Sequence, residues 1–109
     1  MADTKKFLTL RERTAYHRLE DVIGCKWSTG VVAAIGENIR RPGELERYIP
    51  GISKKILNER LRKLREFGII ERREFAGNVA HVEYHLTTTG EKLRALLEQI
   101  RDLNQDHKP

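Results

Sequence analysis

The chain has 109 residues, with 21 lysines and arginines against 16 aspartates and glutamates, and a formal net charge of +5. This length predicts one domain over residues 1–109, and the single cysteine excludes a disulfide framework within the chain. No apolar run approaches the roughly 20 residues that cross a bilayer. Residues 1–6 lack the apolar stretch of a signal peptide, so we expect a cytoplasmic protein with no membrane partner.

The excess positive charge lies in one short segment. Residues 53–65 (SKKILNERLRKLR) contain six lysines and arginines and one glutamate, whereas the other 96 residues carry 15 basic and 15 acidic side chains. A solvated helix face without a partner is one interpretation. Such faces ordinarily mix both signs, however, because opposite charges four residues apart stabilise a helix. A stripe of one sign is more typical of a surface that binds phosphates.

The first half of the chain predicts three helices. Apolar residues spaced four, three and one apart indicate a helix over residues 11–23. In residues 27–35 two alanines and the nearby glycines favour a short buried helix over a strand. Pro42 suits a first helical turn, where its missing N–H is not needed, so we expect a short helix over residues 42–48. The residues Ile-Pro-Gly at 49–51 then force a turn.

The basic segment predicts a longer helix over residues 53–67. Ser53 is placed to cap its N-terminus with the hydroxyl oxygen, and Gly68 is placed to end it. At 100° per residue, the leucines and the polar residues fall on opposite sides. The leucine side consists of Leu57, Leu61 and Leu64, and the other side carries Lys55, Asn58, Glu59 and Arg62.

Two strands follow, over residues 69–75 and 80–87. In the second, apolar residues alternate with polar ones, which is the period of a half-buried strand. Residues 76–79 form the expected hairpin loop, in which Gly77 can supply a positive φ.

The final predicted helix covers residues 88–106, with a short tail at 107–109. Thr88 and Glu91 are expected to form a capping box at its start. Its apolar residues are spaced three, four and three apart, which is a heptad seam. Together with Tyr16 near the N-terminus, this seam predicts a homodimer interface formed by Leu93, Leu96, Leu97, Ile100 and Leu103.

The order of these elements predicts a mostly α fold with a small β-hairpin (α+β). A short helix, a turn and a basic helix make a helix-turn-helix, and a hairpin after it makes a winged helix dimerised through its terminal helices. The major groove of B-DNA is about 12 Å wide and accepts one α-helix. The basic helix is therefore expected to enter the major groove of double-stranded DNA.

The sequence also resembles the HxlR family of bacterial and archaeal winged-helix transcriptional regulators, over about residues 15–100. The matching stretches are IGCKW at 23–27, GEL at 43–45, PGIS at 50–53, the three spaced leucines, FGII at 67–70, VEY at 82–84 and Gly90. The resemblance implies a homodimer bound to operator DNA, with the hairpin at 75–82 against the flanking backbone. Some members sense oxidants with a cysteine ahead of the first helix. Residues 14–17 contain none, so that role does not carry over.

These arguments assign two kinds of DNA contact. Lysines bind phosphates as point charges, whereas arginine, asparagine and glutamate can read guanine, adenine and cytosine edges in the major groove. An N-terminal arm is expected at about residues 1–10 of this domain. The residues assigned to DNA are Arg40, Arg41, Ser53, Lys54, Lys55, Asn58, Glu59, Arg62, Lys63, Asn78 and His81.

Other constellations are weaker. His81 and His85 lack a third ligand in a recognised metal spacing, and Cys25 is better interpreted as a buried small hydrophobe than as a nucleophile. No glycine-rich phosphate loop, carboxylate pair or Ser/His/Asp arrangement is present, so we expect no enzyme, no cofactor and no metal. Two alternatives remain: an RNA-binding winged helix, and a protein-interaction module whose basic helix docks on an acidic partner.

Overall fold

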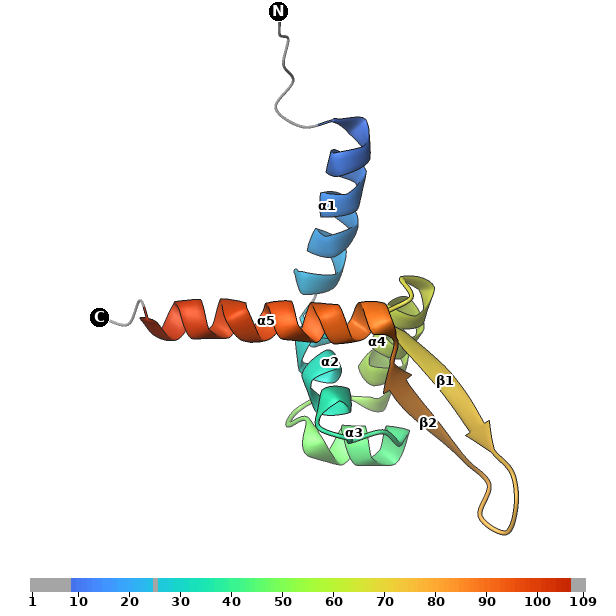
Figure 1. The fold of residues 1–109 in the computed structure, drawn as a ribbon. Coiled ribbons are helices and arrows are strands. Elements are labelled where there is room, and N and C mark those ends of the chain that lie inside the picture. Colours follow the sequence, from blue (N-terminus) through green and yellow to red (C-terminus); the bar gives the residue numbers. More distant parts are fainter. Residues whose placement is uncertain (1–8, 25, 107–109) are drawn as a thin grey trace, which may run out of the picture.

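A computed structural model describes residues 9–24 and 26–106 (Figure 1). It contains five helices and one antiparallel hairpin over this part of the chain, which confirms the predicted mostly α winged-helix class. Residues 1–8 of the predicted arm, Cys25 and the predicted tail at 107–109 lie outside the described residues. The elements are α1 (Leu10–Ile23), α2 (Ser28–Gly36), α3 (Pro42–Tyr48), α4 (Lys54–Glu66), β1 (Ile70–Phe75), β2 (His81–Leu86) and α5 (Thr88–Asp106).

The helix starts follow from side chains that satisfy free backbone N–H groups. The hydroxyl of Ser53 accepts a hydrogen bond from the N–H of Ile56 at 3.1 Å, as predicted for the cap of α4. The predicted capping box at Thr88 is wrong, because Thr88 already lies in α5. The hydroxyl of Thr87 caps this helix instead, accepting from the N–H of Gly90 at 3.0 Å. Thr87 also donates to the carbonyl oxygen of Gly68, which ties α5 to the end of α4.

The turn between α3 and α4 brings the two helices of the helix-turn-helix together. Gly51 has a φ of +83°, in the left-handed region that glycine enters without steric cost. On either side of it, Ile49 and Ile52 are buried. The turn is therefore held by apolar contacts on both sides of one glycine.

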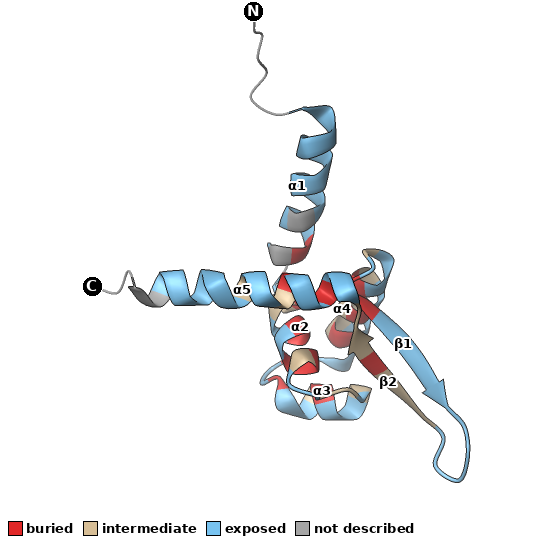
Figure 2. Cartoon of the chain, viewed as in Figure 1, coloured by how far each residue is buried: buried red, intermediate tan, exposed pale blue. Residues whose placement is uncertain are grey.

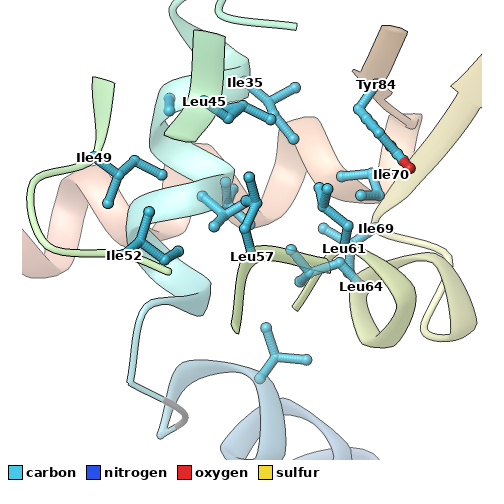
Figure 3. Packing of buried hydrophobic residues seen from close by; sticks show 14 of the residues in the cluster. Ile35, Leu45, Ile49, Ile52, Leu57, Leu61, Leu64, Ile69, Ile70 and Tyr84 are labelled. Atoms are coloured by element: carbon cyan, nitrogen blue, oxygen red, sulfur yellow. The ribbon is translucent and has the colours of Figure 1, made fainter. Parts of the chain in front are cut away.

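The core lies where α2, α3 and α4 meet the base of the hairpin (Figure 3). Leu57, Leu61 and Leu64 are 1%, 2% and 0% exposed, so the leucine side of α4 is fully inside. They pack in one cluster with Leu45 of α3 and Tyr84 of β2. Burying one such side chain contributes about 1.5–3 kcal/mol relative to exposing it. This packing fixes the rotation of α4 about its own axis.

The hairpin projects from this core (Figure 1). Its register runs from Ile70 opposite Leu86 at the base to Phe75 opposite His81 at the far end, and Gly77 in the loop has the predicted positive φ. β2 is also joined to the segment between α2 and α3, because the N–H of Tyr84 donates to the carbonyl oxygen of Arg40 at 2.8 Å. The base of the hairpin is thus anchored and its loop is exposed.

The two terminal helices extend beyond the core. α1 leaves it in one direction and the second half of α5 in another, and both are largely exposed (Figure 2). Leu10, the last residue of the predicted arm, already belongs to α1. Over the residues that the structure describes, no helix is long and apolar enough to span a membrane.

Candidate nucleic-acid interface

The outward face of α4 carries exposed cations and one amide. Lys54, Lys55, Asn58 and Arg62 are exposed, as the helical spacing predicts. Glu59, which the same spacing also places away from the leucines, is half-buried. The buried leucines on the opposite side keep these polar residues outward, because any rotation of α4 about its axis would expose the leucines to water. Helix α4 thus presents hydrogen-bond donors along its solvent-facing side.

Arg62 has a partner on its own helix. Its Nη1 donates to Oε2 of Glu66 at 2.9 Å, and both side chains are more than half exposed. Exposed ion pairs of this kind stabilise proteins by only about 0–1 kcal/mol. Arg62 can therefore exchange this carboxylate for another acceptor at little cost.

Lys63 lies on the flank of α4 rather than on its outward face. Its Nζ is 3.9 Å from Oδ2 of Asp21 on α1, and its side chain is 28% exposed. This contact directs Lys63 toward α1. Of the lysines assigned to phosphates, Lys54 and Lys55 are thus the better placed.

Two further assigned residues, Ser53 and Arg40, also have structural roles. The hydroxyl oxygen of Ser53 accepts the capping hydrogen bond of α4, so only its own hydrogen is available to a phosphate. Arg40 is half-buried and supplies the carbonyl oxygen that pairs with β2. Arg41 is exposed at the N-terminus of α3.

Within the hairpin, the two assigned residues differ. Asn78 is exposed in the loop. The side chain of His81 is 20% exposed and stacks on Phe75, with ring centroids 4.9 Å apart and planes 11° apart. Strand pairing packs the ring of His81 against Phe75, and the assignment of His81 to DNA stays a prediction.

A cluster that the sequence analysis missed lies on one face of the hairpin. Nε2 of His81 and Nε2 of His85 lie 3.0 Å and 2.8 Å from the two carboxylate oxygens of Glu83. We call these three residues the histidine–glutamate cluster. These hydrogen bonds hold the pKa of Glu83 below its usual value, with His85 the larger contributor and His81 the second. The signal was the i, i+2, i+4 spacing, which places side chains on one face of a strand. Over residues 9–24 and 26–106, no three histidine, cysteine, aspartate or glutamate side chains are arranged so that they could hold a metal ion.

The predicted dimer interface is partly exposed and partly internal. Tyr16, Leu96, Ile100 and Leu103 are 52%, 41%, 46% and 69% exposed, and Leu97 is half-buried against the core. Leu93 is 4% exposed, so its assignment to the partner is corrected: it packs in the core of its own chain because it lies on the first turns of α5.

A groove of about 850 Å³ lies between α2 and the outer half of α5. Ala33, Leu97 and Ile100 contribute apolar surface to its walls, and Arg94 and Arg101 contribute charge. Arg94 is held in place by Glu37, which directly follows α2, at 3.0 Å. The groove thus continues the exposed apolar side of α5 onto the core.

Comparison with known proteins identifies the family to which the chain belongs. Residues 22–109 match the model of the HxlR-like helix-turn-helix family. The HTH-type transcriptional regulator YkvN of Bacillus subtilis, itself uncharacterised, is 35% identical over 81 residues, which span 74% of this chain and 69% of YkvN. Among solved structures, a protein described as a MarR-family transcriptional regulator from Enterococcus faecalis V583 has a TM-score of 0.78 and 26% identity, covering 94% of this chain and 93% of that one. The reduced form of the transcriptional regulator YodB from B. subtilis has a TM-score of 0.76 and 26% identity, covering 93% and 95% of the two chains.

The two solved structures share the fold of this chain over more than nine-tenths of its length. The family model spans every element from the end of α1 onward. The chain belongs to the HxlR-like helix-turn-helix family of transcriptional regulators.

Proposed function

We propose that this regulator binds double-stranded operator DNA as a homodimer, with α4 in the major groove and the hairpin loop on the flanking backbone. The observation that carries the proposal is the division of α4 into a buried leucine side and an exposed polar side. Such a helix can enter a groove about 12 Å wide without disturbing the core. Binding to chromosomal DNA places the protein in the cytoplasm, and no catalytic role is proposed.

Within α4, the exposed residues divide by chemistry. Lys54 and Lys55 lie in the first turn, where free backbone N–H groups also favour an anion, so they bind phosphates. Asn58 and Arg62 lie one and two turns further along and read base edges, with Glu59 beside them. Arg41 and Asn78 support the complex at its margins, where Ser53, Arg40 and Lys63 add weaker contacts.

The homodimer joins the exposed apolar residues of α5 to the corresponding surface of a second copy. Leu96, Ile100 and Leu103 share one side of the helix at spacings of four and three. Tyr16 of α1 adds an exposed aromatic ring. A two-fold dimer of this kind reads two half-sites about 34–36 Å apart.

Selection of bound sequences from a random duplex pool tests the function directly. A winged-helix reader of DNA enriches a two-fold symmetric site, and its affinity falls steeply with salt. Six to ten neutralised phosphates correspond to a loss of about 10³–10⁵ in affinity between about 50 and 200 mM salt. A flat salt response, or no enriched sequence, would refute it.

The two alternatives give different outcomes in a competition assay. An RNA-binding winged helix prefers a structured RNA over a duplex DNA of equal length. A protein-interaction module binds neither nucleic acid with sequence preference at physiological salt. Both remain open, and the order of competition decides among the three.

A further inference from the structure

The starting point is the geometry around His81. Its Nε2 lies 3.0 Å from Oε2 of Glu83, and its Nδ1 lies 3.0 Å from the carbonyl oxygen of Val79. Both neighbours are hydrogen-bond acceptors with no hydrogen to give, since a carboxylate and a backbone carbonyl only accept. A neutral imidazole carries one N–H and can satisfy only one of them. The protonated ring carries two and satisfies both.

The second contact of His81 reaches the hairpin loop. Val79 is 69% exposed and belongs to the loop between β1 and β2. A protonated His81 therefore links the loop to Glu83 in the middle of β2. Stacking on Phe75, the residue opposite it on β1, holds the ring in position for both bonds.

His85 completes the cluster from the other side of Glu83. Its Nε2 donates to Oε1 at 2.8 Å, and its side chain is only 12% exposed. One carboxylate thus accepts from two imidazoles. Because these bonds lower the pKa of Glu83, its carboxylate stays ionised while the histidines gain or lose protons.

Among the described residues, no other charged side chain is shown to take the place of Glu83 as the hydrogen-bond acceptor for the two imidazoles. On β1, Glu71 lies opposite His85 and Arg73 lies opposite Glu83. Nε of Arg73 donates to Oε2 of Glu71 at 2.7 Å, so these two β1 residues pair with each other. Helix α2 carries no charged side chain. The other charged residues on elements that pack against β2 are Arg40 and Arg41 ahead of α3, Glu44, Glu46 and Arg47 on α3, Arg72 and Glu74 on β1, and Glu91, Lys92 and Arg94 near the start of α5.

The net charge of the hairpin depends on these two histidines. Residues 70–86 contain three glutamates and two arginines, so the segment has a formal charge of −1 when both imidazoles are neutral and +1 when both are protonated. Histidine changes charge between about pH 5 and pH 8. A hairpin that is repelled by phosphate at the upper end of this range is attracted at the lower end.

We propose that the hairpin is a proton-sensitive DNA contact, in which protonation of His81 and His85 fixes the loop to β2 and makes the segment cationic. The inference rests on the proposed function for its effect on DNA. The protein then binds a duplex more tightly as the pH falls from about 8 to about 5. Because both rings are held against Glu83, each added charge acts on a phosphate from a distance and is expected to raise affinity about twofold, the effect of a unit charge pair some 8 Å apart in water.

The test is binding to a fluorescein-labelled duplex of random sequence, measured by fluorescence anisotropy at fixed ionic strength across this pH range. The unchanged protein is expected to gain about fivefold in affinity on acidification, and its salt slope is expected to steepen. The double variant His81→Gln/His85→Gln is expected to lose this gain. The matched control is His17→Gln, which removes an exposed histidine beside Glu20 on α1 and leaves the gain intact.

Circular dichroism at both ends of the pH range checks that the double variant is folded. If it is not, His85→Gln alone serves, because it leaves the link from His81 to Val79 in place and is expected to lose about half of the gain. Equal pH dependence in the variant and the unchanged protein would overturn the inference.

A second measurement does not depend on DNA binding. Nitrogen-15 NMR of the imidazole rings is expected to show both nitrogens of His81 protonated at low pH, with the resonances of loop residues 76–80 moving at the same midpoint. If no duplex binds at any pH, the proposed function fails and this readout alone decides the inference. A loop whose resonances ignore the state of His81 would overturn it.

Discussion

Arg62 donates a hydrogen bond from Nη1 to Oε2 of Glu66, one turn further along α4, at 2.9 Å. A residue assigned to a base edge is therefore paired inside its own helix while DNA is absent. In the proposed complex a base acceptor replaces Glu66, so this carboxylate would compete with DNA for the guanidinium of Arg62. The effects of Arg62 and Glu66 on DNA affinity can therefore be tested by substituting each residue.

Replacing Glu66 by Gln is expected to raise affinity for a selected duplex about 1.5- to 5-fold, the equivalent of an exposed ion pair. Anisotropy titration measures it, and Glu91→Gln, on the exposed start of α5, controls for removal of an acidic charge. When Arg62 is already replaced by Ala, Glu66→Gln should raise the affinity no more than Glu91→Gln does. An undiminished gain there would show that Glu66 acts by charge alone.

Arg62→Ala itself is expected to cost about 1–3 kcal/mol at one base pair and to relax specificity at that position. Binding to a panel of duplexes with one substitution each measures this. A uniform loss over the panel would mean that Arg62 binds phosphate, and the division of roles along α4 would be wrong.

Lys55→Ala is expected to weaken all duplex sequences alike and to reduce the salt slope by about 1, because one phosphate contact is lost. Lys92→Ala on α5 is the matched control, since it removes an exposed lysine far along the chain from α4. A sequence-dependent effect of Lys55→Ala would contradict its assignment to phosphate.

The sequence predicts the elements well where one periodic signal dominates. The leucine spacing fixes which side of α4 is buried, and Ser53 and Gly77 have the geometry that their residue types favour. Thr87 was missed as the cap of α5 because Thr87, Thr88 and Thr89 are chemically equivalent in sequence. Only the contact with Gly68 in the folded chain distinguishes them.

The candidate site is less predictable because tertiary contacts reassign its side chains. The assignment of Lys63 to phosphate could not anticipate Asp21, which is 42 positions earlier in the sequence. Leu93 fits the heptad spacing of its helix, but the core closes over it while Leu103 stays exposed. Periodicity gives the side of a helix, whereas the length over which that side meets the core depends on the packing of other elements.

Leu61→Ala is expected to destabilise the fold by about 2–5 kcal/mol, because the side chain is 2% exposed and its removal leaves a cavity. Urea denaturation measures the free energy of unfolding. The neighbouring change Arg62→Ala is the control and should alter it by no more than about 0.5 kcal/mol. Equal effects of the two changes would contradict the division of α4 into a buried and an exposed side.

Ile100→Glu tests the proposed homodimer. Ile100 is 46% exposed in the single chain and lies between Leu96 and Leu103 on one side of α5. A carboxylate there has to be dehydrated at the centre of the interface, whereas at Gln99, which is exposed on the next position, it remains in water. Light scattering at micromolar concentration is therefore expected to give the mass of two chains for the unchanged protein and for Gln99→Glu, and the mass of one chain for Ile100→Glu. Because each copy supplies one α4, the monomeric variant should also lose the preference for two half-sites while keeping weak binding to one, and a dimer that survives Ile100→Glu would place the interface elsewhere.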